Sequence, residues 1–169
     1  MSAAAIGAAI GVLVLVSAAL VLVEAWTGYA TVFLEEARDL AGYLEYRARA
    51  KLAVVGASIE GGALNVTVEN QGSVEVSLGE GAVAVAVYTS GRVTRHDVLP
   101  YGAGLRVLYR VVGGRAYSAR PGSTATLMPG ESAVLAINLT LTPDPGSVVR
   151  LVVCSGEGVC CSYALPVPG

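Results

Sequence analysis

The N-terminal third of the chain lacks the residues that keep a helix out of a membrane. Ser2–Val23 has no charged side chain, no lysine or arginine precedes Arg38, and no proline lies between Ser2 and Leu52. At about 1.5 Å per residue, an uncharged helix of this length spans the roughly 30 Å hydrocarbon core of a bilayer. The sequence therefore predicts a transmembrane helix over residues 1–23.

The missing basic residues also argue against a cleaved signal peptide. Such a peptide starts with basic residues, continues with an apolar stretch of about 7–15 residues and ends at a small-residue cleavage site. Ser17-Ala18-Ala19 has the composition of a cleavage site, but Leu20–Val23 beyond it remain apolar. We therefore expect the segment to be retained as an anchor.

Residue types that carry chemistry are scarce. The net charge is −2 and no basic run occurs, which argues against a nucleic-acid partner. The single histidine, His96, lies between Arg95 and Asp97 without a serine or cysteine nucleophile motif, as on an ordinary charged strand. The acidic residues lack the spacing of a calcium-binding loop. We expect no enzymatic activity, no cofactor and no metal site.

The residues after the apolar run continue a helical pattern. Trp26 and Tyr29 follow Glu24 at the depth where aromatic rings meet lipid headgroups. Apolar side chains then recur every three or four residues, with charged residues on the other side. We expect a helical stalk over residues 24–52, whose apolar stripe either packs on the chain's own domain or pairs with a neighbouring copy. The expected helix-packing seam combines small residues of the anchor with this stripe: Gly7, Gly11, Phe33, Leu40 and Leu44.

From Ala53 the pattern changes from helix to strand. Short runs that alternate apolar and polar residues are separated by turn signals, and no helical stretch interrupts them. This series favours an antiparallel, immunoglobulin-like β-sandwich over residues 53–169. The fold class is therefore mostly β, with one long N-terminal α-helix. The predicted strands are Ala53–Glu60, Ala63–Glu69, Val74–Leu78, Gly81–Tyr88, Arg92–Leu99, Leu105–Val112, Ser123–Leu127, Glu131–Leu141, Val148–Cys154 and Val159–Leu165.

One predicted strand is apolar on both faces. In Gly81–Tyr88, the valines at positions 83, 85 and 87 alternate with alanines. Such a strand is either central and covered on both sides, or part of an interface.

Two sequons and three cysteines bear on which side of the membrane the domain lies. Asn65 and Asn138 each begin an N-glycosylation pattern on the polar face of a predicted strand. Cys154, Cys160 and Cys161 straddle the last predicted hairpin, and we expect a disulfide from Cys154 to one of the other two. Both features favour a domain outside the cell.

Two short passages resemble the archaellum stator proteins FlaF and FlaG of archaea. Val66–Val74 is similar to that family's V-x-N-x-G-S strand and turn, and Leu127–Glu131 is similar to its L-x-P-G-E turn. The resemblance implies a single-pass protein of the cell membrane with its immunoglobulin-like domain on the extracellular, pseudoperiplasmic side. It also implies a stator that tethers the archaellum motor to the S-layer protein, contacts other archaellum components and forms a homo-oligomer.

Two other interpretations stay open. A type IV pilin or archaellin-like filament subunit also carries a β-domain on a long N-terminal helix, although its precursor has a short basic leader and this chain starts at Met1-Ser2-Ala3. A membrane-tethered binding module would need a pocket with convergent aromatic side chains. The tyrosines of this chain are instead spread over different predicted segments.

Overall fold

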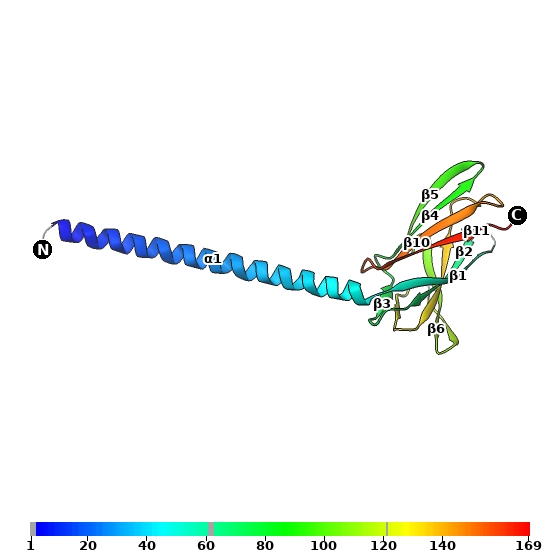
Figure 1. Cartoon of the computed structure of the whole chain (residues 1–169), viewed down its shortest axis with the longest axis horizontal. Coiled ribbons are helices and arrows are strands. Elements are labelled where there is room, and N and C mark those ends of the chain that lie inside the picture. The colour runs from blue at the N-terminus through cyan, green and yellow to red at the C-terminus, as the bar shows by residue number, and fades with distance from the viewer. Residues whose placement is uncertain (1–2, 61–62, 121) are drawn as a thin grey trace. The chain divides into compact units, whose positions relative to one another are not determined.

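The computed structural model describes residues 3–60, 63–120 and 122–169, with side chains of the helix from Ile10 onward. These residues form one long helix followed by eleven strands (Figure 1). They fall into two compact units, Met1–Glu45 and Tyr46–Gly169. The elements are α1 (Ala3–Arg49), β1 (Leu52–Glu60), β2 (Ala63–Asn70), β3 (Val76–Leu78), β4 (Val83–Ser90), β5 (Val93–Pro100), β6 (Leu105–Val112), β7 (Arg115–Ser118), β8 (Ala125–Leu127), β9 (Ser132–Asn138), β10 (Val148–Cys154) and β11 (Cys160–Pro166).

The helix α1 has 47 residues and includes a stretch that is long and apolar enough to cross a membrane. It ends at Arg49 rather than at Leu52, where the predicted stalk ended. The reason is local, because the Lys51 carbonyl accepts hydrogen bonds from the β2–β3 turn instead of continuing the helical ladder. Leu52 is already the first residue of β1.

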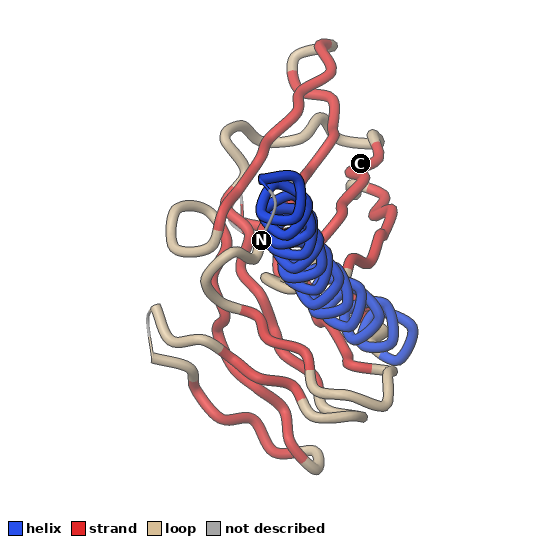
Figure 2. Tube along the Cα trace, turned by 90° about the vertical axis from the view of Figure 1, so that its left-hand side faces the viewer, coloured by secondary structure: helices blue, strands red, loops and turns tan. Residues whose placement is uncertain are grey.

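The β-domain is a sandwich of two main antiparallel sheets, as the sequence predicted. One sheet has the strand order β1-β2-β9-β6-β7 and the other has the order β11-β10-β4-β5, while β3 pairs with β8. The ladders between these strands are antiparallel. Figure 2 shows the strands joined by loops, with α1 as the single helix of the described residues.

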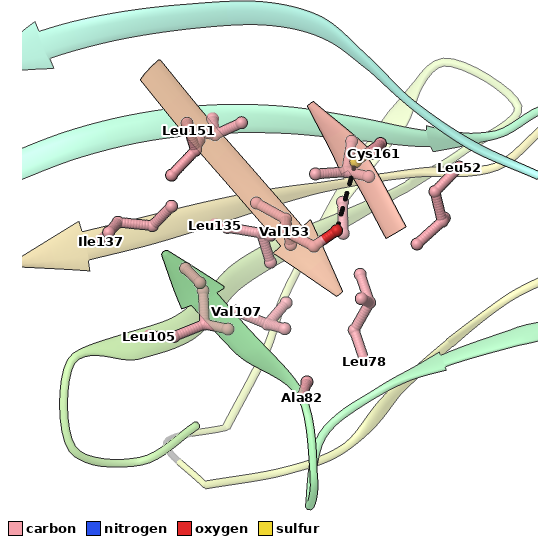
Figure 3. Close-up of a cluster of buried hydrophobic side chains, with 14 of the residues drawn as sticks. Leu52, Leu78, Ala82, Leu105, Val107, Leu135, Ile137, Leu151, Val153 and Cys161 are labelled. Atoms are coloured by element: carbon pink, nitrogen blue, oxygen red, sulfur yellow. Dashed lines mark hydrogen bonds between the residues drawn. The ribbon is translucent and has the colours of Figure 1, made fainter. Parts of the chain in front are cut away.

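The core is built from alternate residues of both main sheets. The side chains at alternate positions from Leu64 to Val68 of β2 are buried, which confirms the predicted inward face of that strand. Leu135 of β9 and Leu151 and Val153 of β10 lie in the same cluster (Figure 3). The period-two burial follows from the pleat, which points successive side chains to opposite faces.

One strand, β7, was not predicted from the sequence. β7 pairs with the end of β6, but all four of its residues are exposed, so no apolar alternation marks Arg115–Ser118 as a strand. The pairing of β6 with β9 also shifts register between Val107 and Tyr109, which is a β-bulge. This bulge changes which β6 side chains continue the inner face of the sheet.

Candidate interaction surfaces

The predicted helix-packing seam is exposed along the stalk. Phe33, Leu40 and Leu44 are 70%, 59% and 56% exposed, and a Cβ built on Gly11 would meet nothing within 4 Å. Gly7 lies outside the residues whose side-chain surroundings are described. Exposed apolar stripes of this kind are typical of surfaces that pack against another helix or against lipid.

The stripe has the spacing of a coiled coil. Six apolar residues alternate at intervals of four and three, which is the pattern of the two apolar rows in a heptad repeat. The charged residues from Glu35 to Asp39 lie outside both rows. The six residues are Trp26, Ala30, Phe33, Ala37, Leu40 and Leu44.

A second candidate surface is the outer face of the β11-β10-β4-β5 sheet. Alanines of β4 face the core, whereas its valines at positions 83, 85 and 87 face outward and are half-buried. The register places Val85 opposite Val98 of β5 and Val152 of β10. We call Val83, Val85, Val87, Val98 and Val152 the valine face. β4 is therefore a central strand of its sheet. Because its valine side is only partly covered, an interface is favoured over a strand buried on both faces.

The valine face is bordered by two basic residue types. Val87 lies between His96 of β5 and Arg150 of β10, and both are exposed. No aspartate or glutamate occurs in the cross-strand rows that run through the β4 valines. Within the valine face, the Val98 side chain is 67% exposed. An apolar patch with a polar rim is typical of a protein–protein contact.

The three cysteines have different surroundings. Cys154 and Cys160 face each other across the β10–β11 hairpin and form a disulfide, with their Cα atoms 4.0 Å apart. Cys161 is buried on the opposite side of β11, where its Sγ lies 3.7 Å from the Val153 carbonyl oxygen (Figure 3). Burial raises the pKa of the Cys161 thiol to about 11. Cys161 therefore behaves as a core residue.

Both sequons begin on the outer face of the β1-β2-β9-β6-β7 sheet. Asn65 is half-buried on β2, and its Nδ2 donates to Glu60 Oε2 at 3.4 Å. Asn138 is the last residue of β9 and is exposed. Neither asparagine faces the core, so a glycan at either position would point away from it.

The two passages that carry the family resemblance meet at one buried side chain. Asn70 is fully buried, and its Nδ2 donates to the carbonyl oxygens of Val74 and Leu127, each at 2.8 Å. Its Oδ1 accepts the Gly72 N–H at 2.9 Å. The Asn70 N–H also donates to the Glu131 carbonyl. This one residue ties the turn after β2 to the turn between β8 and β9.

The turn after β2 also caps the C-terminal end of α1. The Ser73 N–H donates to the Arg49 carbonyl at 2.9 Å, and the N–H groups of Gln71 and Gly72 donate to the Lys51 carbonyl at 2.8 and 3.1 Å. A Cβ on Gly72 would lie 2.5 Å from the Arg49 carbonyl oxygen, so only glycine permits this approach. The turn satisfies carbonyl groups that a helix end leaves unpaired. The last turn of α1 thus folds as part of the second unit.

The described residues offer little for metal or acid–base chemistry. Within residues 10–60, 63–120 and 122–169, no group of three or more histidine, cysteine, aspartate or glutamate side chains is placed to hold a metal ion. His96 lies on exposed β5 beside the valine face.

The structure defines a class of protein in which a long N-terminal helix precedes an antiparallel β-sandwich. No family model matches the sequence, and no curated protein matches it. Solved structures of similar fold include archaellum proteins. The archaellum periplasmic stator protein FlaG from Sulfolobus acidocaldarius is 14% identical, with a TM-score of 0.51 over 69% of this chain and 99% of that chain.

A filament structure is similar over a longer part of the chain. The archaeal flagellum of Methanospirillum hungatei strain JF1 is 14% identical, with a TM-score of 0.65 over 96% of this chain and 93% of that chain. A complex of FlaF and FlaG from Sulfolobus acidocaldarius is 16% identical, with a TM-score of 0.48 over 68% of this chain and 88% of that chain. At these identities the likeness concerns the fold, and it includes the order of helix and sandwich.

Proposed function

We propose that this protein is a non-enzymatic, membrane-anchored component of the archaeal motility machinery. In this proposal it is a stator-like protein that tethers the archaellum motor to the S-layer. The observation that carries it is the similarity of the β-domain to FlaG over 99% of that chain, joined here to an uncharged helix able to cross a membrane. The two passages that resemble the family's turns add support, because Asn70 joins them by hydrogen bonds in this chain.

The domain plan assigns a task to each segment. Residues 1–23 cross the cell membrane once, residues 24–52 form the stalk, and residues 53–169 form the sandwich on the extracellular, pseudoperiplasmic side. The Cys154–Cys160 disulfide supports this orientation, because such bonds persist in oxidising compartments. The sequons at Asn65 and Asn138 supply acceptor sites on the same side.

We further propose that the protein forms a homo-oligomer through its seam and its valine face. Copies anchored in one membrane with the same orientation have parallel helices at equal depth. Each apolar residue between Trp26 and Leu44 then lies at the same height as the identical residue of the neighbouring copy. S-layer protein and other archaellum components are the further partners in this proposal.

A filament subunit is the second candidate function. It is favoured by the similarity to the Methanospirillum hungatei flagellum, which covers 96% of this chain and so includes the helix. In that case the exposed seam would pack in the core of a filament. The stator and the filament subunit share the same fold and differ in where the protein resides.

The location of the native protein separates the two candidates. The experiment extracts the protein from membranes, measures the mass of its N-terminal peptide and identifies the proteins that co-purify. A retained N-terminus with S-layer or motor proteins in the eluate supports the stator. A processed N-terminus and recovery in sheared extracellular filaments would overturn it in favour of the filament subunit.

A further inference from the structure

We propose that a hollow beside the β6–β7 hairpin binds a saccharide unit that carries a carboxylate or sulfate group. The hollow has a volume of about 290 Å³ and lies between this hairpin and the segment that leads into β8. It is a separate site from the seam and the valine face. The inference does not depend on whether the protein is a stator or a filament subunit.

The β-bulge in β6 brings Arg110 into the lining of the hollow. Before the bulge, Leu105 and Val107 continue the buried inner face of the sheet. After it, Arg110 lies opposite the fully buried Ala133 of β9, so Arg110 rather than Tyr109 continues that face. Bulges commonly redirect a side chain in this way near functional sites.

Arg110 is held in a fixed position. Its Nε and Nη2 donate to Glu131 Oε2 at 3.0 and 2.6 Å, and the same carboxylate oxygen accepts the Met128 N–H at 2.9 Å. The hydrogen bond from Arg110 lowers the pKa of the Glu131 carboxyl, with burial acting in the opposite direction. A guanidinium has five N–H donors, so these two bonds leave donors of Arg110 for a ligand. The Arg110 side chain is 35% exposed.

An exposed aromatic ring lies beside this arginine. Tyr117 of β7 is directly opposite Arg110 in the ladder and is 53% exposed. Paired residues of an antiparallel ladder share one face of the sheet, and both residues line the hollow. The C–H groups of a pyranose ring pack well on the face of a tyrosine, which is one reason that aromatic side chains line sugar sites.

The rest of the lining is basic or hydroxylic. Arg120 contributes a second guanidinium, and Ser118, Ser123 and Thr124 contribute hydroxyl groups. None of the described residues that line the hollow is acidic, although Glu131 forms an ion pair with Arg110. Glu131 offsets the charge of Arg110, and Arg120 adds a second guanidinium, so the hollow keeps an excess of positive charge that favours an anion.

The ligand class follows from these three kinds of group. Planar guanidinium groups match carboxylate and sulfate oxygens, often with two parallel hydrogen bonds. Hydroxyl side chains suit the hydroxyl groups of a sugar, and the tyrosine suits its ring. The volume is at the lower end of the range for small-molecule sites, which fits one sugar unit rather than a long segment.

The test measures binding to the full chain in micelles of an uncharged detergent. The probes are a glucuronate-containing tetrasaccharide, a sulfated disaccharide, a neutral glucose tetrasaccharide, sodium sulfate, and vesicles of anionic phospholipid, each followed by calorimetric titration. We expect at least one acidic saccharide to bind, and at least tenfold more tightly than the neutral saccharide or sodium sulfate. We expect Tyr117→Ala and Arg120→Ala each to weaken that binding at least tenfold.

The matched control is Arg106→Ala, which removes an exposed arginine from the same strand β6 outside the hollow. It should leave the affinity unchanged within a factor of two. Equal binding of sulfate and saccharide, equal loss in Arg106→Ala, tighter binding of the vesicles, or no binding at millimolar saccharide would each overturn the proposal. Circular dichroism spectra of the variants check that the β-domain remains folded.

Discussion

At the residue scale, Asn70 is the side chain on which the domain depends most clearly. Replacing it with alanine leaves the buried Leu127 carbonyl and the partly buried Val74 carbonyl without their donor. Each buried polar group left unsatisfied costs about 1–3 kcal/mol. We expect Asn70→Ala to lower the free energy of unfolding by roughly 2–4 kcal/mol.

The measurement for Asn70 is urea unfolding followed by circular dichroism of the β-domain. The control is Asn65→Ala, which changes the same residue type on the outer face of the same strand. Surface changes of that kind usually shift stability by about 0.5 kcal/mol or less. Equal stability of the two variants would show that the Asn70 hydrogen bonds do not hold the turns together.

Cys161 illustrates how burial decides reactivity. With a thiol pKa of about 11, about one Cys161 in a thousand is a thiolate at pH 8 in the folded protein. We therefore expect a maleimide to label the native protein very slowly and the urea-unfolded protein at least a hundredfold faster. Mass spectrometry of the labelled peptide identifies the site. Fast labelling of Cys161 in the folded state would contradict its placement in the core.

At the scale of elements, the β4–β5 hairpin is fastened by a carboxylate from the β9–β10 loop. Asp144 accepts the N–H groups of Gly91 and Arg92 at 2.8 and 3.0 Å. Both turn residues have positive φ, of 61° and 63°. These hydrogen bonds, led by that from the Arg92 N–H, lower the pKa of the Asp144 carboxyl below its ordinary value of 3.8.

A lowered carboxyl pKa determines the pH dependence of this contact. The ionised form is stabilised in the folded state, so its contribution is present above pH 3.8 and is lost as the pH falls through the lower folded pKa. We expect the amide signals of Gly91 and Arg92 to shift in nuclear magnetic resonance spectra with a midpoint below pH 3.8. The shift should vanish in Asp144→Asn. A midpoint above that value would contradict the assignment.

The valine face gives a prediction about association. Val85 points outward and is half-buried, so lysine at this position can keep its ammonium group in water while it breaks the apolar row. We expect Val85→Lys to fold and to weaken self-association at least tenfold, as measured by analytical ultracentrifugation in detergent. Thr67→Lys is the control, because Thr67 is half-buried on the outer face of the other sheet. An unchanged melting temperature with unchanged dimer content would remove the valine face as an interface.

The fold could be predicted from the sequence where one physical pattern is repeated many times. The alternation in β2 and the change of period near Ala53 located the sandwich, because burial on one face imposes a period of two. Which face of β4 points to the core could not be predicted from the sequence, because alanine and valine are both apolar. β7 carries no burial signal, and the bulge that places Arg110 beside Tyr117 depends on pairing between distant strands. The sugar-binding hollow was therefore missed.

At the scale of the whole molecule, the apolar rows of α1 predict parallel pairing of copies in the membrane. Phe33 lies in one row, whereas Glu35 lies outside both. Under mild oxidation of membranes, we expect Phe33→Cys to form disulfide-linked dimers and Glu35→Cys to remain largely monomeric. Gel electrophoresis without reductant provides the measurement. Equal cross-linking of the two variants would mean that copies meet without a defined helix face.

The hydrogen bonds between the end of α1 and the β2–β3 turn have a mechanical consequence. A pull on the helix reaches the sandwich through the covalent link into β1 and also through the main-chain bonds from Gln71, Gly72 and Ser73. Tyr46 adds a side-chain bond to the Glu75 carbonyl at 3.0 Å. Tension is therefore divided between two adjacent strands from the outset, so that no single edge strand carries the whole load.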